Sequence, residues 1–302
     1  MTPIWLIAGP TASGKSALAL DLARKVGGEI VGADSMQLYR DLRVLTARPS
    51  EADEAAAPHH LFGVADAAEA WSVGRWLGEA LRLLDEIAGR GRPAVVVGGT
   101  GLYFRALTVG LADIPPTPAR VRAEVLALWE AVGEVTFRER LAVVDPAAEA
   151  RIAPADRQRL TRALEVFQAT GRSLTDWQAD TASPLPREAW RGAVLTLPRA
   201  ELYARVEARL DAMAAGGARE EVAALLARRL DLRLPAMKAL GVASFAAELA
   251  GRLTPDAALA EAKTETRRYA KRQIAWFNTQ AADWPRLDAR ASAATLAASL
   301  AA

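Results

Sequence analysis

Short apolar segments alternate with amphipathic segments over the first hundred residues. The apolar runs at residues 4–8, 29–33 and 93–97 have the length of buried strands. Between them, residues 16–26 and 71–90 carry apolar side chains three or four positions apart, which predicts helices. Strands that alternate with helices in this way predict an α/β fold, in which helices flank a parallel sheet.

This alternation stops at a proline cluster, residues 112–118, which is typical of a linker or turn. Residues 119–170 are helical in pattern and rich in arginine, and a second proline-rich break follows at residues 183–186. The apolar run at residues 192–197 then predicts another core strand. We therefore expect an α-helical insertion domain at residues 113–191.

The remaining segments, residues 1–112 and 192–302, are expected to form one α/β core domain of the type found in P-loop NTPases. Helical patterns continue from residue 200 to about residue 280. The tail after Arg290 is rich in alanine, and we expect it to be a frayed helix or disordered.

The composition describes a globular protein, with 302 residues of which 51% are apolar and 25% charged. The absence of cysteine excludes disulfides and a cysteine nucleophile, and no apolar run has the length of a membrane span. We expect a cytoplasmic protein with no membrane partner. The net charge is only +2, and arginine far outnumbers lysine. That bias favours phosphate or RNA contacts. A GC-rich genome would also produce it, and on composition alone the genome is the preferred explanation.

A phosphate-binding motif lies between the first predicted strand and the first predicted helix. Residues 9–16 match G-x-x-x-x-G-K-[ST] in full. The glycines let backbone amides turn toward phosphate oxygens, and the helix N-terminus adds its positive end. Lys15 supplies a full charge, and the Ser16 hydroxyl is placed to hold Mg²⁺. The residues expected to bind a diphosphate are Gly9, Pro10, Thr11, Ala12, Ser13, Gly14, Lys15 and Ser16.

Other motifs narrow the phosphate chemistry without settling it. The chain has no Asn-Lys-x-Asp guanine reader, and the strand at residues 93–97 ends in glycines instead of acidic residues. A GTPase and an ATPase motor are therefore disfavoured, whereas a small-molecule kinase remains open. Ligands of open parallel sheets bind at the carboxyl ends of the strands, so Gly9, Asp34 and Thr100 should converge. Asp34 could bind the metal, act as a general base or cap a helix.

Several separated motifs together resemble the tRNA dimethylallyltransferases, also called tRNA isopentenyltransferases or IPP transferases. The resemblance covers nearly the whole chain, and the DSMQLYR, GGTGLY, RALEV–TG and RRYAKRQ motifs, in this order, are far more specific than the phosphate motif alone. The matching segments are GPTASGKS (9–16), ADSMQLYRDL (33–42), TARPS (46–50), HHL (59–61), VGGTGLYFRAL (97–107), DRQRLTRALEVFQATG (156–171), LYARVEARLDAM (202–213) and TETRRYAKRQIAWF (264–277).

The resemblance implies that a dimethylallyl group moves from its diphosphate to N6 of the adenosine just 3′ of the anticodon. The product would be N6-isopentenyladenosine in tRNAs that read codons beginning with U. Dimethylallyl diphosphate would occupy residues 9–16, with Mg²⁺ as cofactor. The catalytic residues would be Asp34 as general base, Lys15 and Arg205 on the pyrophosphate, and Thr100 on the bridging oxygen.

The resemblance also implies a tRNA partner, bound through its anticodon stem-loop, and we expect the protein to be a monomer. Asp34, Ser35, Met36, Gln37 and Thr100 would surround the target base, and the Gln37 amide would pair bidentately with an adenine edge. The insertion domain would contribute Arg122, Gln158, Arg159, Leu160, Thr161 and Arg162. Arg267, Arg268, Lys271 and Arg272 form a basic helix stripe without acidic partners at those positions, which suggests contacts with phosphates. A solvated helix face is the alternative.

Other interpretations stay open beside this one. An adenylate isopentenyltransferase, the kinase and a non-catalytic RNA-binding module use the same cradle. The chain departs from the family pattern at Leu45, Arg48 and Trp71, and most at residues 239–244, where the usual Tyr and Lys are missing. We expect a structural role for His59 and His60 at a helix start. Tyr103 and Phe104 either line a channel or belong to the core.

Overall fold

The computed structural model describes residues 3–301 and divides the chain into two compact units. Val109–Pro184 form the insertion unit, and the segments before and after it form the core unit. The insertion unit starts at residue 109, where residue 113 was expected, because the last core helix before it already ends at Thr108. It ends at residue 184 instead of 191, because the next core strand begins at Trp190.

The core unit contains a parallel sheet, which confirms the predicted α/β class. Its strand order is β3-β2-β4-β1-β5-β6, and the neighbouring strands pair in parallel throughout the described residues. The strands are β1 (Ile4–Ala8), β2 (Glu29–Gly32), β3 (His59–His60), β4 (Ala94–Gly98), β5 (Trp190–Thr196) and β6 (Arg286–Asp288).

Helices connect these strands. They are α1 (Lys15–Val26), α2 (Glu51–Ala56), α3 (Val73–Gly89), α4 (Gly101–Thr108), α9 (Arg199–Ala215), α10 (Ala218–Ala227), α11 (Val242–Leu249), α12 (Pro255–Gln280) and α13 (Ala293–Ala301), with 3₁₀ turns η1 (Arg187–Ala189) and η2 (Ala236–Lys238). None of the helices in the part of the chain described here combines the length and apolarity needed to cross a bilayer.

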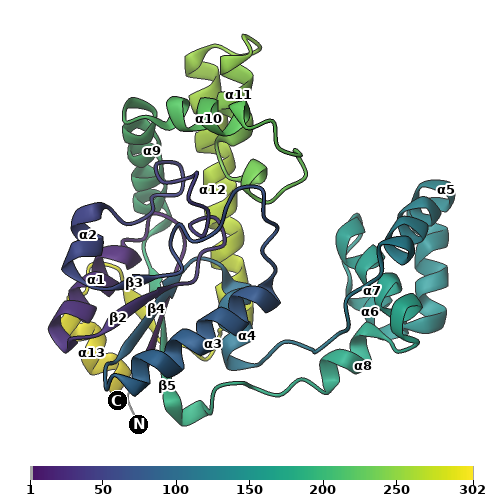
Figure 1. The fold of residues 1–302 in the computed structure, drawn as a ribbon, viewed down its shortest axis with the longest axis horizontal. Coiled ribbons are helices and arrows are strands. Elements are labelled where there is room, and N and C mark those ends of the chain that lie inside the picture. Colours follow the sequence, from purple (N-terminus) through teal and green to yellow (C-terminus); the bar gives the residue numbers. More distant parts are fainter. Residues whose placement is uncertain (1–2, 302) are drawn as a thin grey trace. The chain divides into compact units, whose positions relative to one another are not determined.

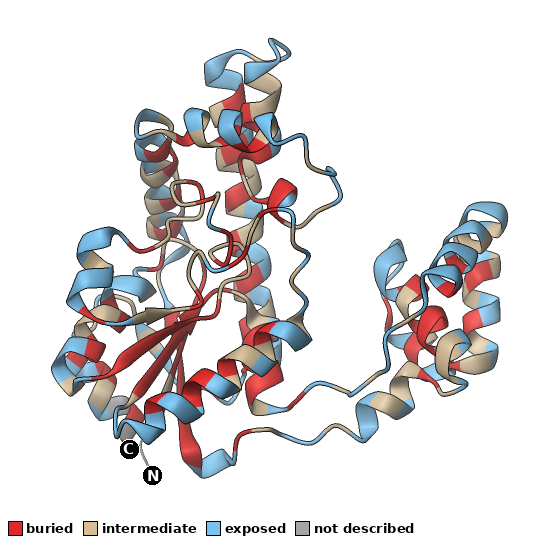
Figure 2. Ribbon diagram, viewed as in Figure 1, coloured by how far each residue is buried: buried red, intermediate tan, exposed pale blue. Residues whose placement is uncertain are grey.

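The central strands are buried along most of their length (Figure 2), and alternate residues of a strand face opposite sides of the sheet. Leu6 lies in a core cluster with residues of α3, α4, α9 and α12, whereas Ile7 lies in a second cluster with residues of α1 and α13. The sheet is therefore covered on both faces, as a parallel sheet requires (Figure 1).

Two sequence expectations for the core unit are wrong. The alanine-rich tail is a helix within the described residues, but it packs on the core instead of fraying, since α13 buries Ala293, Leu296 and Leu300 against α1 and the sheet. The histidines do not start a helix, because His59 and His60 form the edge strand β3 beside β2.

The insertion unit is helical and has its own core. It contains α5 (Ala119–Val144), α6 (Pro146–Arg151), α7 (Arg157–Thr170) and α8 (Leu174–Ala179). α5 is interrupted at Gly133, whose φ of 69° lies outside the helical region. Phe137, Leu141 and Leu160 are fully buried in this core.

Candidate active site

The ends of β1, β2 and β4 meet at one edge of the sheet, as expected. The N–H of Ala33, which follows β2, donates to the carbonyl of Val97 over 2.8 Å, and the N–H of Thr100 donates to Ala33 over 3.1 Å. The backbones are so close that a Cβ on Gly98 would lie 1.9 Å from the Ala33 oxygen. Glycine at position 98 is therefore required for this approach.

Hydrogen bonds join residues 34–37 (the Asp34 loop) to residues 98–100 (the Thr100 loop). The Ser35 N–H donates to the Thr100 hydroxyl over 3.0 Å, and that hydroxyl donates to Ser35 Oγ over 3.3 Å. Asp34 Oδ1 accepts the Met36 N–H over 3.0 Å. The residues after Asp34 form turns instead of a helix, so its interpretation as a helix cap is wrong.

Residues 9–16, here called the phosphate loop, curl as the motif predicts. Gly14 and Ala12 have positive φ angles of 88° and 62°. The N–H of Ser13 donates to Pro10, and the N–H of Thr11 donates to a side chain of α12. The amides of residues 12, 14, 15 and 16 donate to no group within residues 3–301, so these four can face an anion.

Gln273, a residue that the sequence did not single out, joins two of these loops. Its Oε1 accepts the N–H of Thr11 over 2.8 Å, and its Nε2 donates to the carbonyl of Gly99 over 2.9 Å. The side chain is 5% exposed. Gln273 therefore fixes the distance between the phosphate loop and the Thr100 loop.

Positive charge that is partly withdrawn from water gathers at the phosphate loop. Burial lowers the pKa of Lys15 to about 8, with nearby Asp34 opposing this shift and Arg209 adding to it. Arg209 of α9 donates to the Thr11 hydroxyl, and desolvation lowers its pKa. Its Nε is buried without a partner among the described residues.

Arg209 lies one helical turn after the predicted Arg205, on the same face of α9. Arg205 also approaches the loop, since its Nη1 is 3.7 Å from the position of a Cβ on Gly14. However, Arg205 is paired with Glu201 over 2.7 Å. The structure therefore adds Arg209 as the arginine in direct hydrogen-bond contact with the phosphate loop.

Aromatic side chains of α3, α4 and α12 pack next to the phosphate loop and the Asp34 loop. Tyr103 stacks on Trp76 with ring centroids 4.0 Å apart, and Phe104 packs edge-on against Phe277. Both are 2% exposed, so the interpretation as core residues is correct. Tyr269 of α12 was not predicted, and burial together with the Asp34 charge raises its pKa.

Gln37 is held in one orientation. Its Nε2 donates to the carbonyls of Thr46 and Ala47, both over 2.9 Å. In this conformation both amide hydrogens are occupied, so only Oε1 is available to a base. The bidentate adenine contact expected from the sequence would require the amide to leave these carbonyls.

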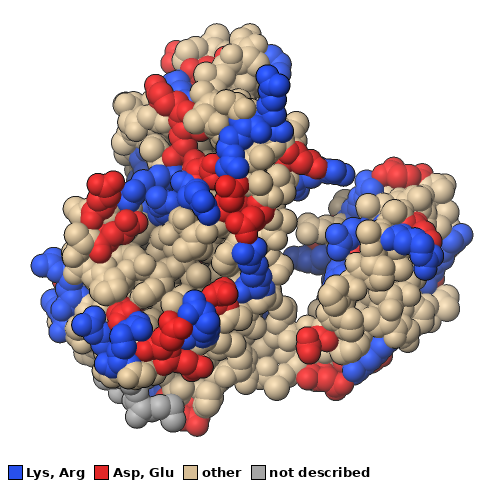
Figure 3. Space-filling view, in the orientation of Figure 1, with Lys and Arg blue, Asp and Glu red and all other residues tan. Residues whose placement is uncertain are grey.

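The basic stripe of α12 is less uniform than expected. Arg267 pairs with Glu207, so it does have an acidic partner. Arg268, Lys271 and Arg272 are exposed and form no ion pair within residues 3–301. Elsewhere on the face of the core unit in Figure 3, basic and acidic side chains lie side by side.

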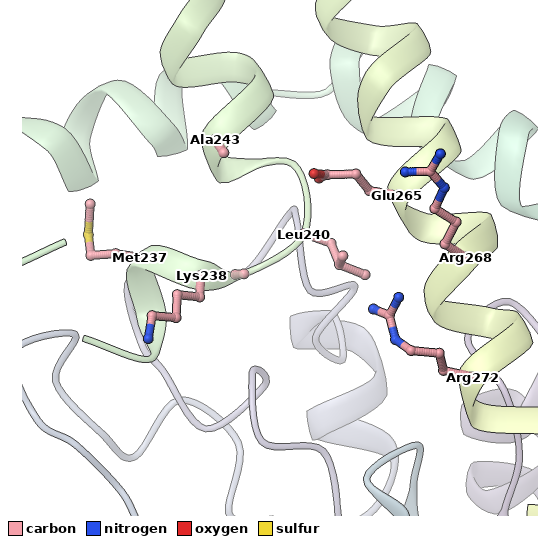
Figure 4. Close-up of a pocket in the computed structure, with 8 residues that line it drawn as sticks. Met237, Lys238, Leu240, Ala243, Glu265, Arg268 and Arg272 are labelled. Carbon is pink, nitrogen blue, oxygen red and sulfur yellow. The ribbon is translucent and has the colours of Figure 1, made fainter. Parts of the chain in front are cut away.

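A cavity of about 260 Å³ lies between α12 and the segment that departs from the family pattern. Arg268 and Arg272 of α12 line it opposite Leu240 and Ala243 (Figure 4). Leu45, the other notable departure, lies 3.1 Å from the position of a Cβ on Gly241. The two departures therefore pack against each other.

The predicted residues of the insertion unit divide into exposed and buried groups. Gln158 and Arg159 are exposed on the first turn of α7, and Arg122 is exposed on α5. Leu160 and Thr161 are buried, with 0% and 6% exposure, so they can support an RNA contact but not touch RNA themselves in this structure.

Arg162 and Arg122 flank a buried acid of the insertion unit. Arg162 donates to Thr117 over 2.6 Å. Arg162 and Arg122 lie 3.8 and 3.9 Å from Glu165, and burial raises the pKa of that carboxyl.

The two histidines have structural contacts, as expected. His60 Nε2 is 2.7 Å from Glu29 Oε2, and His59 Nδ1 is 2.8 Å from the Ala57 oxygen. Among the described residues, no group of three or more His, Asp or Glu side chains could hold a metal ion.

The fold and the site together define a P-loop α/β protein with a phosphate-binding site, in which a phosphate loop and a carboxylate meet at one sheet edge. The family comparison is consistent with this geometry. The IPP transferase family model matches residues 37–280, and an isopentenyl transferase model matches residues 2–57. The chain belongs to the IPP transferase family, the tRNA dimethylallyltransferases.

The similarity to known proteins extends over almost the whole chain. The tRNA dimethylallyltransferases of Phenylobacterium zucineum and a Caulobacter species are 63% and 59% identical, over 95% of this chain and 92% and 93% of theirs. The tRNA isopentenylpyrophosphate transferase of Bacillus halodurans has a TM-score of 0.71 at 31% identity, covering 100% of this chain and 97% of that one. A eukaryotic dimethylallyltransferase acting on tRNA has a TM-score of 0.81 at 26% identity, covering 96% and 74%.

Proposed function

We propose that this enzyme transfers a dimethylallyl group from dimethylallyl diphosphate to N6 of the adenosine 3′-adjacent to the tRNA anticodon. The observation that carries the proposal is the meeting of the Asp34 carboxylate with the cationic phosphate loop at one sheet edge. Carbon 1 of the allyl group would lie between them. The N6 lone pair forms the new C–N bond while the C1–O bond breaks, and pyrophosphate leaves with the bonding electrons.

The chain's own residues supply the charge and proton chemistry. Adenine N6 is a weak nucleophile because its lone pair is delocalised, so it must lose a proton as it attacks. Asp34 accepts that proton, a contribution of about 10²–10⁴-fold in rate. The free amides of the phosphate loop, with Lys15 and Arg209, stabilise charge on the leaving pyrophosphate, and the Thr100 hydroxyl would donate to its bridging oxygen after turning away from Ser35 Oγ.

Mg²⁺ is part of the proposal. The Ser16 hydroxyl is exposed and forms no hydrogen bond within residues 3–301, which fits a ligand for a metal bound mainly by diphosphate oxygens. The ion would neutralise diphosphate charge. Ser16 would contribute one oxygen, and the remaining ligands would come from the substrate and water.

The RNA partner is proposed to be the anticodon stem-loop, bound in the cytoplasm by a monomer. Exposed cations on α12 and on the insertion helices would neutralise phosphates, and the salt dependence of binding grows with the number of phosphates neutralised. Replacing Arg268 and Arg272 together by Ala should weaken tRNA binding and lower the slope against salt by about two. An unchanged slope would indicate that this helix face is simply solvated and does not contact phosphates.

The central test uses labelled dimethylallyl diphosphate with either tRNA or AMP. Label in tRNA supports the proposal, and label in AMP alone supports an adenylate isopentenyltransferase. Phosphorylation that depends on ATP, without prenyl transfer, would indicate a small-molecule kinase. Mapping the modified nucleoside to the position 3′ of the anticodon completes the assignment.

A further inference from the structure

A carboxylate from α10 holds the loop that follows the Asp34 loop. Glu221 accepts the N–H groups of Arg43, Val44 and Leu45 over 2.6, 2.7 and 2.9 Å. Three consecutive amides that point at one anion form a strong, charge-assisted arrangement. Glu221 lies in the first turn of α10, where the helix N-terminus also favours negative charge.

The loop that Glu221 holds is the one that orients Gln37. The carbonyls of Thr46 and Ala47 accept both hydrogens of the Gln37 amide. These carbonyls follow directly after the three amides bound by Glu221. The conformation of residues 43–47 therefore connects the Gln37 side chain to a carboxylate that lies 178 positions from Arg43 in sequence.

This connection gives Gln37 a defined chemistry. With Nε2 occupied, its Oε1 can only accept a hydrogen bond. An acceptor at this position fits the exocyclic amine of a base and disfavours a carbonyl there, because two acceptors repel. Adenine presents such an amine, whereas guanine presents a carbonyl oxygen at the same ring position.

We propose that Glu221 is a positioning residue that keeps Gln37 acceptor-only and so contributes to choosing an amine-bearing base as prenyl acceptor. The inference rests on the proposed function. It assigns Glu221 no contact with tRNA or with the diphosphate. Its effect is transmitted entirely through the backbone of residues 43–47.

The experiment is a double-mutant cycle between Glu221→Gln and Gln37→Ala, measured by steady-state prenyl transfer to tRNA. Glutamine at position 221 turns an amide NH₂ toward one of the three N–H groups and loosens the loop. We expect each single variant to lose about 10-fold in kcat/KM for tRNA, mostly in KM, with little change in dimethylallyl diphosphate affinity. The double variant should lose no more than the more impaired single variant, because both changes remove the same interaction with the base.

The enzyme's discrimination between adenine and guanine at the target position provides a readout that would not change if Glu221 had only a structural role. A tRNA with G at the target position has no N6 amine to accept the prenyl group, so its binding is measured as competitive inhibition of transfer to the otherwise identical tRNA with A. We expect this G-bearing tRNA to inhibit the Glu221→Gln variant more strongly, relative to the KM for the A-bearing tRNA, than it inhibits the wild type. Glu220→Gln is the matched control, because Glu220 is the exposed neighbour on the same helix turn and forms no hydrogen bond or ion pair within residues 3–301. It should retain wild-type kinetics.

Losses that add in the double variant, or a loss confined to diphosphate affinity, would overturn the inference. Glu221→Asp keeps the charge, and partial recovery of tRNA KM in that variant separates positioning from misfolding. Wild-type enzyme that transfers no label to tRNA would instead contradict the proposed function, so the two failures are distinguishable.

Discussion

Gln273 offers the sharpest test of how the site is assembled. Gln273→Leu keeps the size of the side chain but leaves the Thr11 N–H and the Gly99 carbonyl without their partner. Each unpaired buried group costs about 1–3 kcal/mol. Gly99 is buried and Thr11 is half-buried, so water can reach only one of them readily. We expect a loss of about 3 kcal/mol in the free energy of unfolding of the core unit.

The functional effect should exceed the loss of stability. Without Gln273 only the pairing of β1 with β4, which ends at Ala8 and Gly98, holds the phosphate loop near the Thr100 loop, so the diphosphate and the acceptor base are less well aligned. A small misplacement of reacting groups can cost about 10²-fold in rate. Urea unfolding, diphosphate binding and single-turnover transfer measure the three quantities separately.

The Gln273→Glu variant tests the direction in which stability changes with pH. The carboxylate can still accept from Thr11, but it opposes the Gly99 carbonyl unless it is protonated. Burial and this carbonyl raise the pKa of the introduced carboxyl, while Lys15 and Arg209 oppose the rise. Because a raised pKa gives stability below the unfolded value that is lost as pH rises, the variant should recover toward wild type as pH falls.

Gln280→Leu is the control, since Gln280 is exposed on the same helix and its side chain accepts a hydrogen bond from the exposed Arg105. Its effect on unfolding should stay within about 0.5 kcal/mol. A Gln273→Leu variant that unfolds at the wild-type urea concentration and binds dimethylallyl diphosphate with unchanged affinity would refute the proposed role. In that case Gln273 would be an incidental contact.

The remaining predictions concern the base, the arginines and a buried acid. Asp34→Asn should lower single-turnover transfer by about 10²–10⁴-fold while tRNA still binds in a filter assay; normal turnover would remove Asp34 as the base. Arg209→Ala should lower kcat/KM for the diphosphate by about 10²-fold, and Arg205→Ala by much less; the reverse order would restore Arg205 as the main clamp. The hydrogen bond from Arg90 holds the pKa of Glu29 below its usual value, so its contribution is present above the unfolded-state pKa and lost as pH falls through the lowered pKa. Glu29→Gln should lower the free energy of unfolding by about 2–4 kcal/mol at pH 7. At acidic pH, where Glu29 is protonated in the wild type, the urea unfolding curves of the two proteins should coincide.

The parts of the site that local sequence encodes were predictable. The phosphate loop needs a glycine pattern between a strand and a helix, and the Asp34 and Thr100 loops follow apolar runs. Parallel strands bring their carboxyl ends together, so their convergence followed from the fold class.

Contacts between distant elements were harder to predict. Gln273 lies 262 positions from Thr11, and only packing brings them together. A signal did exist, because Ala270, Gln273 and Phe277 share one helix face and a polar residue on an otherwise apolar stripe calls for a buried partner. Arg209 carried a similar signal, one turn beyond Arg205.

Composition misled in one place. The alanine content of the tail suggested disorder, yet Ala293, Leu296 and Leu300 recur at three- and four-residue spacing. That narrow stripe is enough because α13 packs on α1, whose own face is already apolar. Strand β3 had no such signal, since two residues are too short for a pattern.

The contact between Leu45 and Gly241 makes substitutions at the two departures interdependent. Replacing Leu45 alone by glycine would open a hole beside Gly241. Enlarging residue 242 alone would press on α12, and enlarging residue 243 alone would fill the cavity beside Arg268 and Arg272. A chimera that exchanges both segments together should be better tolerated than either exchange by itself. Mutational tolerance measured in another member of the family therefore does not transfer to these positions one residue at a time.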